Sequence, residues 1–365
     1  MNTIAQNGPH IIRLKSFVEP QDILTRHGYV IQPLTDEELL LKRRCLGCGK
    51  ALSRCIPKKN NHSRCLTPTH ATDETLTAIV LPTSSIDKPA SASGFRCKYH
   101  PDKITQKRWT CCGQHMSAKP CSGSHTHCPR MYAAGELDKL YQFHPTPDIL
   151  HYSSDIREAV ALDALDCEMG TAVSGDSDLI RITVIDYFTC ELLLNNIVEP
   201  SVPMQHLNTR FSGVTWADVR NAKRLGSCFK AKEEARRALW RYVGPEIVVV
   251  GHGASNDLRA LRWIHQLVMD SMLTEYLART GSQLLQRASF SIKKQEDKDA
   301  VFVPTKKAKK LRQNSARQFS LKTLTKKRLD RDIQISGKLG HDSLEDATAA
   351  RDLVHWIVAH PEELQ

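Results

Sequence analysis

Four acidic residues and one histidine, placed in three short segments, constrain this chain more than any other feature. Asp166 and Glu168 stand in ALDCEMG, Asp257 in GHGASNDLRAL, and His341 and Asp346 in GHDSLEDATAA. On a strand, residues two positions apart point to the same face, so Asp166 and Glu168 can converge on one site. They follow an apolar run, and a buried strand that ends in two acids needs a partner to neutralise them, most simply a metal ion.

Each segment has an ordinary explanation when it is taken alone. Surface strands carry D-x-E pairs, Asp257 could be a helix-start residue favoured by the helix dipole, and His341 could be a surface histidine. Together the segments describe a two-metal site, in which ions about 3.5 to 4 Å apart activate a water and stabilise the leaving oxygen of a phosphodiester. Such ions prefer oxygen ligands, and a nearby histidine can accept the proton of the water.

The periodicity after residue 156 predicts an α/β domain. Strands are expected at 159–167, 179–186, 190–198, 246–250 and 267–270, and helices at 231–242, 256–265 and 343–359. Three strands in a meander, followed by alternating helix and strand, predict a mixed central sheet flanked by helices.

Charge and length indicate the kind of partner. The 365 residues suffice for two domains, and 51 Lys and Arg against 40 Asp and Glu give 51 − 40 = +11. This excess favours a polyanion such as nucleic acid, although a basic protein without such a partner remains an alternative. The first 16 residues lack a secretory core and apolar runs such as 247–250 are too short for a bilayer, so we expect a soluble protein of the nucleus and cytoplasm.

Nine of the twelve cysteines lie between Cys45 and Cys128. In a reducing compartment such clustering predicts zinc rather than disulfides, although a group of reduced thiols is the alternative. Tetrahedral zinc takes four ligands, so one or two sites are possible. The expected ligands are Cys45, Cys48, Cys97, His100, Cys112, Cys121 and His127, with Cys111 and His125 as further candidates.

We expect four parts along the chain. Residues 1–44 form a partly helical segment, with a capping box at Thr35, and 45–128 form the Cys/His-rich region with a flexible insertion at about 67–94. A linker follows at 129–155, and the catalytic domain occupies 156–361 with a basic insertion at about 281–319. That insertion is a solvated charge run, a nuclear address or an RNA-contacting arm.

The three acidic segments resemble the motifs of the DEDD superfamily of 3′–5′ exonucleases, in the subgroup whose third motif supplies a histidine. TRFSGVT at 209–215 is similar to the TRxSGIT segment of Rex-type RNA exonucleases, and SLKTL at 320–324 resembles their segment before the third motif. Met169 stands where proofreading DNA exonucleases usually have threonine. The resemblance covers residues 156–359. The upstream cysteine pattern resembles both fungal Rex proteins and half of a CHORD-type zinc module.

The resemblance implies a ribonuclease H-like fold and assigns roles to the site residues. Asp166, Glu168, Asp257 and Asp346 would ligate two Mg²⁺ or Mn²⁺ ions, His341 would be the general base, and Met169 and Arg210 would contact the terminal nucleotide. Core packing and a surface charge remain alternatives for the last two. The implied activity trims the 3′ ends of structured noncoding RNAs, such as ribosomal, small nuclear or RNase MRP RNA, and releases 5′-nucleotides. Cleavage of DNA ends and an inert zinc-module RNA-binding adaptor are the alternatives.

Overall fold

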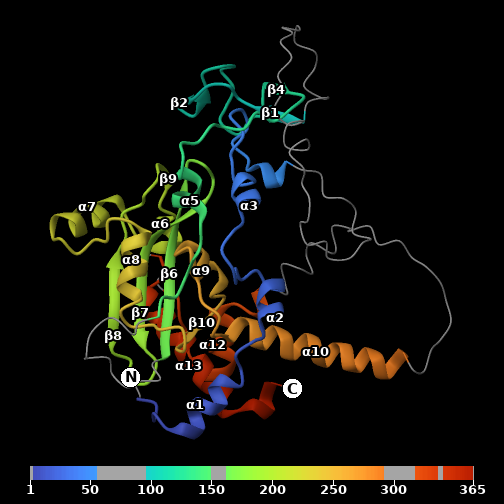
Figure 1. Cartoon of the computed structure of the whole chain (residues 1–365), viewed down its shortest axis with the longest axis vertical. Coiled ribbons are helices and arrows are strands. Elements are labelled where there is room, and N and C mark those ends of the chain that lie inside the picture. Colours follow the sequence, from blue (N-terminus) through green and yellow to red (C-terminus); the bar gives the residue numbers. More distant parts are fainter. Residues whose placement is uncertain (1–2, 56–95, 149–161, 292–316, 336–339, 365) are drawn as a thin grey trace. The chain divides into compact units, whose positions relative to one another are not determined.

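The computed structural model describes residues 3–55, 96–148, 162–291, 317–335 and 340–364, which separate into two compact units (Figure 1). The larger unit joins Met1–Pro33 to Phe143–Gln365, and the smaller unit is Leu34–Gln142. The insertion expected at 67–94 and the core of the basic insertion lie outside the described residues. In the described part of the chain, no helix combines the length and apolar character needed to cross a bilayer.

The larger unit is built on one mixed β-sheet. In spatial order its strands are β8 (Leu192–Ile197), β7 (Ser177–Asp186), β6 (Leu162–Ala172), β10 (Val248–Gly251) and β12 (Val268–Asp270). The antiparallel pairing of β6, β7 and β8 is the predicted meander, and β10 and β12 run parallel to β6. β9 (Met204–His206) pairs with the last residues of β6. The predicted mixed sheet flanked by helices is confirmed.

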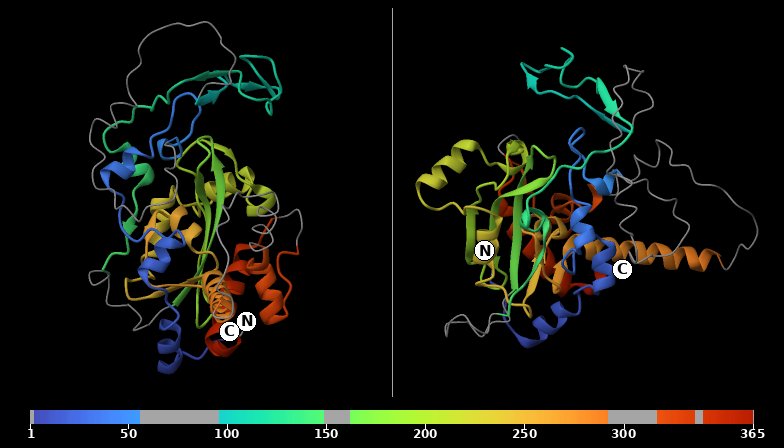
Figure 2. Two further views of the ribbon diagram at one scale, coloured as in Figure 1. Left: turned by 90° about the vertical axis from the view of Figure 1, so that its right-hand side faces the viewer. Right: turned by 45° about the horizontal axis from the view of Figure 1, so that its top comes forward.

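Helices cover this sheet. After β9 they are α6 (Thr209–Ser212), α7 (Trp216–Arg224), α8 (Lys232–Leu239), α9 (Ser255–Ala260), α10 (Ser271–Ser291), α12 (Leu321–Leu329), α13 (Ser343–Ala359) and the 3₁₀ turn η3 (Pro361–Leu364). The left view of Figure 2 shows α13, in red, beside the green strands, and α13 packs against β6, β7 and β10.

The sheet separates two hydrophobic cores because side chains alternate between its faces. Leu165 and Cys167 of β6 pack in the core that includes α8 and α9 residues. Ala164 packs in the other core, with residues of α13. Asp166 and Glu168 continue the alternation that begins at Ala164, so their side chains leave β6 on the face covered by α13.

The first 33 residues belong to the larger unit, so the boundary expected after residue 44 falls earlier. Helices α1 (Gly8–Lys15) and α2 (Gln21–Arg26) each bury one leucine, Leu14 and Leu24, in the two cores of the sheet. Tyr29 is also buried, and its hydroxyl donates a hydrogen bond to Asp270. Apolar burial on the sheet therefore holds this segment.

The stretch 129–155 differs from the expected linker. It contains α5 (Glu136–Tyr141) in the smaller unit and β5 (His144–Pro145), which pairs with β11 (Trp263–Ile264) in the larger unit. The hydroxyl of Thr146 accepts a hydrogen bond from the Trp263 indole. Pairing and hydrogen bonding hold residues 144–146, and residues 149–155 lie outside the described part of the chain.

In its described residues, 34–55 and 96–142, the smaller unit contains only short elements. Besides α5 it contains α3 (Asp36–Leu40), η1 (Leu52–Arg54), β1 (Cys97–Tyr99), β2 (Ile104–Thr105), β3 (Arg108–Trp109) and β4 (Ser122–Ser124). The predicted capping box is present: Thr35 Oγ1 accepts from the Glu38 N–H, and the Glu38 carboxylate accepts from the Thr35 N–H.

Three element predictions need correction. The helix expected at 256–265 ends at Ala260, because Arg262 has a φ of 51° and the next residues form β11. α10 continues to Ser291, into the segment expected as a basic insertion. The first strand extends past its acids to Ala172, since it pairs with both β7 and β9.

Candidate active site and metal-binding groups

The structure brings the four predicted acids to one place in the larger unit. Asp166 and Glu168 lie on β6, Asp257 in the first turn of α9, and Asp346 in the first turn of α13. Asp257 and Asp346 are buried, and Asp166 and Glu168 are half-buried. Four potential negative charges therefore share a site with little water.

The effect of each acid on its neighbours shows this proximity. Burial, followed by the charges of Asp257, Glu168 and Asp346, raises the pKa of Asp166 well above its ordinary value. Burial and the charge of Asp346 raise the pKa of Glu168 to about 8, and a nearby cation, Arg181, acts in the opposite direction. Like charges in a low-dielectric site disfavour ionisation, so the group needs cations to be fully charged at neutral pH.

Asp257 reaches the first strand through a gap in the sheet. β10 pairs with β6 only as far as Ala164, so the next stretch of that β6 edge lacks this partner. Burial and Asp270 raise the pKa of Asp257 well above its ordinary value, and a hydrogen bond from the Cys167 N–H opposes this rise. That N–H belongs to the residue between Asp166 and Glu168, which places the Asp257 carboxyl beside both.

His341 and Asp346 are five positions apart in the sequence and adjacent in space. The His341 Nδ1 lies 3.4 Å from the Asp346 Oδ2, and the imidazole remains partly exposed whereas the carboxyl is buried. Asp342 caps α13 by accepting from the backbone N–H groups of Leu344 and Glu345. The cap fixes the first helical turn, so Asp346 points inward while His341 stays at the surface.

Gln334 is a site residue that sequence reasoning missed. Its Nε2 donates to both carboxyl oxygens of Asp346, at 3.1 and 3.0 Å, while its backbone has a φ of 54°. Burial raises the pKa of Asp346 to about 6, although the hydrogen bond from Gln334 and the charge of His341 lower it. No pattern marks Gln334 in the sequence, because it stands in an irregular segment after α12.

Arg181 was also missed. It lies on β7 directly opposite Glu168, and its guanidinium donates to Asn195 Oδ1 at 3.1 and 2.8 Å. It lowers the pKa values of Asp166 and Glu168, which makes it a fixed cation of the site. Only the strand register identifies it, since a single arginine in an alternating strand is unremarkable.

Met169 and Arg210, the two predicted substrate contacts, lie on neighbouring segments. The Asn208 side chain, just before α6, donates to the Met169 carbonyl oxygen at 3.0 Å, which ties α6 to β6. Met169 is half-buried and packs against the core, whereas Arg210 is exposed. Both residues therefore lie on segments next to the acids, and their contact with a nucleotide stays a prediction.

The acids fit a pair of hard divalent cations. All four offer carboxylate oxygens, the donor type that Mg²⁺ and Mn²⁺ prefer. Asp166 Oδ2 is buried and has no hydrogen-bond partner among the described residues. A buried oxygen of this kind requires a counterpart, and a bound cation would supply it.

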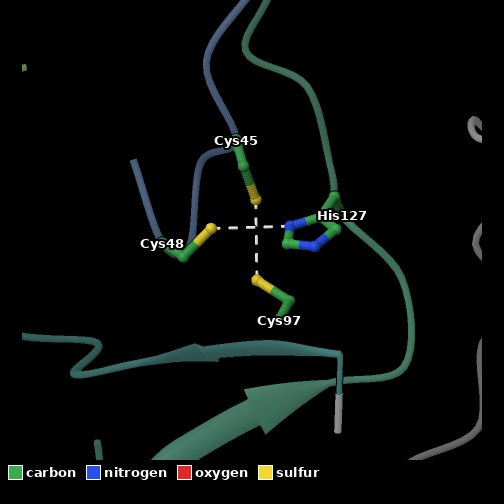
Figure 3. Close-up of side chains that lie close together, drawn as sticks. All are labelled: Cys45, Cys48, Cys97 and His127. Carbon is green, nitrogen blue, oxygen red and sulfur yellow. Dashed lines mark hydrogen bonds between the residues drawn. The ribbon is translucent and has the colours of Figure 1, made fainter. Parts of the chain in front are cut away.

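Two further groups of potential metal ligands lie in the smaller unit. The first contains Cys45, Cys48, Cys97 and His127, whose ligand atoms point toward a common centre in Figure 3. Cys45 and Cys97 Sγ are 3.6 Å apart, and Cys48 Sγ lies 3.5 Å from His127 Nδ1. For tetrahedral zinc, bond lengths of about 2.3 Å to sulfur and about 2.0 Å to nitrogen require separations of roughly 3.5 to 3.8 Å.

Local geometry favours this first group. Gly47 lies against Tyr99 of β1, and a Cβ at Gly47 would come within 2.7 Å of the Tyr99 ring. Burial opposes ionisation of Cys45, but the N–H groups of Cys48 and Gly47 help to lower the pKa of this thiol to about 6. A thiolate is the form of cysteine that binds metals.

The second group contains His100, Cys111, Cys112 and Cys121. His100 Nδ1 lies 3.6 Å from both Cys111 and Cys112 Sγ, and its Nε2 faces the Ala118 carbonyl oxygen at 3.3 Å. The His100 ring also stacks on Trp109, with centroids 4.2 Å apart and an interplanar angle of 8°. Such outer contacts orient a metal-binding histidine.

The structure thus sorts the seven predicted Cys/His ligands into two groups and adds Cys111. Spacing could not do this, because each group combines residues separated by a long stretch of sequence or by two strands. The remaining candidate, His125, belongs to neither group, and nor do Cys55 and Cys128.

The chain is similar to several known proteins. No family model matches it. Proteins named RNA exonuclease 3 are 29% identical over 263 residues in Candida albicans and 27% identical over 373 residues in Emericella nidulans. These matches cover 72% and 92% of this chain and 54% and 50% of the relatives, so the chain spans about half the length of these two proteins.

The Saccharomyces cerevisiae protein of the same name is 25% identical over 370 residues, which covers 97% of this chain and 70% of that protein. Among solved structures, the Neurospora crassa Pan2 catalytic unit matches with a TM-score of 0.40 and 18% identity, over 60% of this chain and 30% of that one. The chain is therefore similar, over most of its length, to fungal proteins named RNA exonuclease 3, and the resemblance of its motifs to RNA exonucleases is confirmed.

Proposed function

We propose that this chain is a metal-dependent 3′–5′ exoribonuclease that trims the 3′ ends of structured noncoding RNAs, such as ribosomal, small nuclear or RNase MRP RNA. The observation that supports the proposal best is the convergence of Asp166, Glu168, Asp257 and Asp346 on one buried site beside His341. The names of the relatives support RNA, rather than DNA, as the substrate.

The four acids would hold two Mg²⁺ or Mn²⁺ ions. When bound, the ions would activate the attacking water and stabilise the charge that develops on the leaving 3′ oxygen. The protein keeps the acids in place with the α13 cap, the Gln334 amide and the rigid pairing of β6 with β7. Binding of cations would also remove the repulsion that raises the pKa values of the acids.

His341 would accept the proton of the water. Its Nδ1 faces Asp346, which orients the ring and leaves Nε2 as the nitrogen that can take a proton. The ring is partly exposed, so a water at an RNA terminus can reach it. Release of a 5′-nucleotide follows from attack on the last phosphodiester. Met169 would support a terminal base, and Arg210 would bind ribose or phosphate.

The Asp257→Asn variant tests this function. The substitution removes a predicted metal ligand but keeps the size of the side chain, so we expect release of mononucleotides from a 3′-terminal single-stranded RNA to fall by more than about 100-fold. The control is Asp22→Asn, which changes an exposed acid on α2. Equal turnover by Asp257→Asn and Asp22→Asn would contradict the assignment.

The same assay separates the substrates. Oligomers ending in ribose and in deoxyribose are supplied to the purified protein with Mn²⁺, and we expect faster degradation of the ribose-terminated RNA. Equal degradation of both would favour DNA ends. Binding of RNA without any release of nucleotide would favour an inert adaptor.

We further propose that the smaller unit binds two zinc ions. The first site would use Cys45, Cys48, Cys97 and His127, and the second His100, Cys111, Cys112 and Cys121. The separations of sulfur and nitrogen atoms support tetrahedral zinc at both. Among its described residues the unit buries few apolar side chains, so metal binding would supply much of its folding free energy.

A further inference from the structure

Two large aromatic side chains lie exposed on the segment that borders His341. Phe211 of α6 is 60% exposed, and Trp216, the first residue of α7, is 47% exposed. Exposed aromatic residues of this size are uncommon on protein surfaces that bind nothing. When they gather with charges of one sign, they mark binding sites.

α6 is fixed to the candidate active site at both ends. At its start, Asn208 donates to the Met169 carbonyl oxygen, next to Glu168 of β6. At its other end, the Phe211 carbonyl oxygen accepts a hydrogen bond of 2.7 Å from the His341 backbone N–H. Phe211 therefore occupies a defined position between the first and third acidic segments.

α7 continues this surface without a flexible joint. Gly213 ends α6, and a capping box between Thr215 and Asp218 begins α7 directly afterwards. The aromatic ring of Trp216 thus stands on a rigid helical turn a few residues from Phe211. Pre-organised aromatic rings lose little entropy when a ligand stacks on them.

Cations accompany both rings. The Arg210 guanidinium lies 5.8 Å from the centre of the Phe211 ring. Trp216, Arg220 and Arg224 follow each other at intervals of four residues, so they form one exposed stripe on α7, while Val219 is buried. Among the described residues, neither Arg210 nor Arg220 forms an ion pair within 4.0 Å.

We propose that this surface, formed by Phe211, Trp216, Arg220 and Arg224, binds the single-stranded 3′ segment of the RNA upstream of the terminal nucleotide. Bases stack on the two aromatic rings, and the arginines of α7 contact the phosphates. Stacking accepts every base, so the surface supports trimming without a sequence preference. This inference rests on the proposed exoribonuclease function, since the surface is useful where an RNA end enters the site.

The test measures binding separately from turnover. A fluorescent ten-nucleotide RNA is titrated into full-length Asp257→Asn protein by anisotropy, with Phe211→Ala, Trp216→Ala or both added. We expect each substitution to weaken binding by about 10-fold or more. Leu192→Ala is the matched control, because it removes an exposed apolar side chain at one end of β8. Arg181 of the site pairs with Ile197 at the other end of that strand. The control substitution should change binding by less than twofold.

The salt dependence separates the arginines from the aromatic residues. Arg220→Gln with Arg224→Gln should reduce the slope of log affinity against log salt by about 0.7 for each lost phosphate contact, whereas Trp216→Ala should leave the slope unchanged. In otherwise wild-type protein, Trp216→Ala should raise KM for the ten-nucleotide RNA at least fivefold more than for a dinucleotide.

Several results would overturn this proposal. Trp216→Ala and Phe211→Ala could bind the RNA as the Leu192→Ala control does, or a blunt RNA duplex could bind as tightly as the single strand. Either result, obtained with a wild-type protein that releases mononucleotides, would reject the surface and leave the exoribonuclease function intact. Absence of nucleotide release by the wild type, with normal effects of both aromatic substitutions on binding, would reject the enzymatic function alone.

Discussion

At the scale of single residues, the site depends on side chains that hold the acids rather than bind a substrate. Gln334 donates two hydrogen bonds to Asp346, and its backbone adopts a left-handed conformation that non-glycine residues rarely use. A residue kept in a strained conformation next to a predicted metal ligand indicates a role in positioning that ligand.

Gln334→Met should therefore reduce the affinity of the site for metal more than it reduces the stability of the fold. Loss of both amide donors leaves Asp346 without its orienting partner, and we expect the Mg²⁺ concentration for half-maximal activity to rise by about 10-fold. A metal titration of nuclease activity measures this effect. Ile335→Ala, a substitution of the exposed neighbour, is the control, and an equal metal requirement in the two variants would exclude the positioning role.

His265 predicts a dependence of stability on pH. It is buried, its Nε2 hydrogen bonds to the Ile247 carbonyl oxygen and its Nδ1 to the Thr146 hydroxyl, and burial lowers its pKa to about 4. The unfolded chain binds a proton near pH 6.5, whereas the folded chain does not until about pH 4. The contribution of neutral His265 to the free energy of unfolding is therefore complete above pH 6.5. It falls as the pH falls, and about 3 kcal/mol is lost at pH 4.

Denaturant unfolding at pH 7.5, 5.5 and 4.5 tests this prediction. His265→Asn keeps a side chain that forms hydrogen bonds but cannot be protonated in this range, so its stability should vary less with pH than that of the wild type. The same pH dependence in both proteins would show that other groups control acid unfolding.

At the scale of elements, the contact between α6 and the start of the third segment decides where His341 stands. Gly340 has a φ of 87°, and a Cβ there would come within 2.2 Å of the Gly213 backbone nitrogen. A glycine is needed at position 340 because the two backbones touch at this point. The contact lets the Phe211 carbonyl oxygen reach the His341 N–H.

Gly340→Ala should displace His341 and reduce activity by at least 10-fold, because either backbone must move to make room. Gly175→Ala is a matched control: Gly175 also has a positive φ, 79°, but a Cβ there meets nothing within 4 Å. Both variants pay backbone strain of roughly 1 kcal/mol, so a thermal melt should show a loss of stability in each. Nuclease assays should show the loss of activity only in Gly340→Ala.

At the scale of the whole molecule, the two units rely on different sources of stability. The larger unit buries aliphatic side chains on both faces of its sheet, whereas the smaller unit gathers eight Cys and His ligands in two groups. The stability that hydrophobic burial gives the larger unit does not depend on metal. The smaller unit buries few apolar side chains among its described residues, so its stability depends on bound metal.

Removal of zinc should therefore unfold the smaller unit alone. In full-length protein treated with a strong zinc chelator, we expect hydrogen exchange to become fast in 97–128 and to remain slow in β6, β7 and α13. Elemental analysis before chelation should give two zinc ions per chain. Less than one zinc per chain, with slow exchange in both units after chelation, would contradict this proposal.

The sequence by itself determined the central strands, the final helix and the five residues of the candidate site. Alternation of apolar residues predicted β7 closely, and the spacing of Asp166 and Glu168 required one common face. These features depend on neighbours within a few positions, which the chain displays directly. The resemblance of the three acidic segments to exonuclease motifs then indicated that acids far apart in the sequence belong to one site.

Only the tertiary structure decided which residues meet across the chain. It placed Arg181 opposite Glu168, Gln334 on Asp346, and Phe211 beside His341, and it assigned the Cys and His ligands to two groups. Each of these contacts depends on strand register or on a chain reversal. A change of one residue in register would move a side chain to the other face, and local sequence patterns do not encode that choice between distant segments.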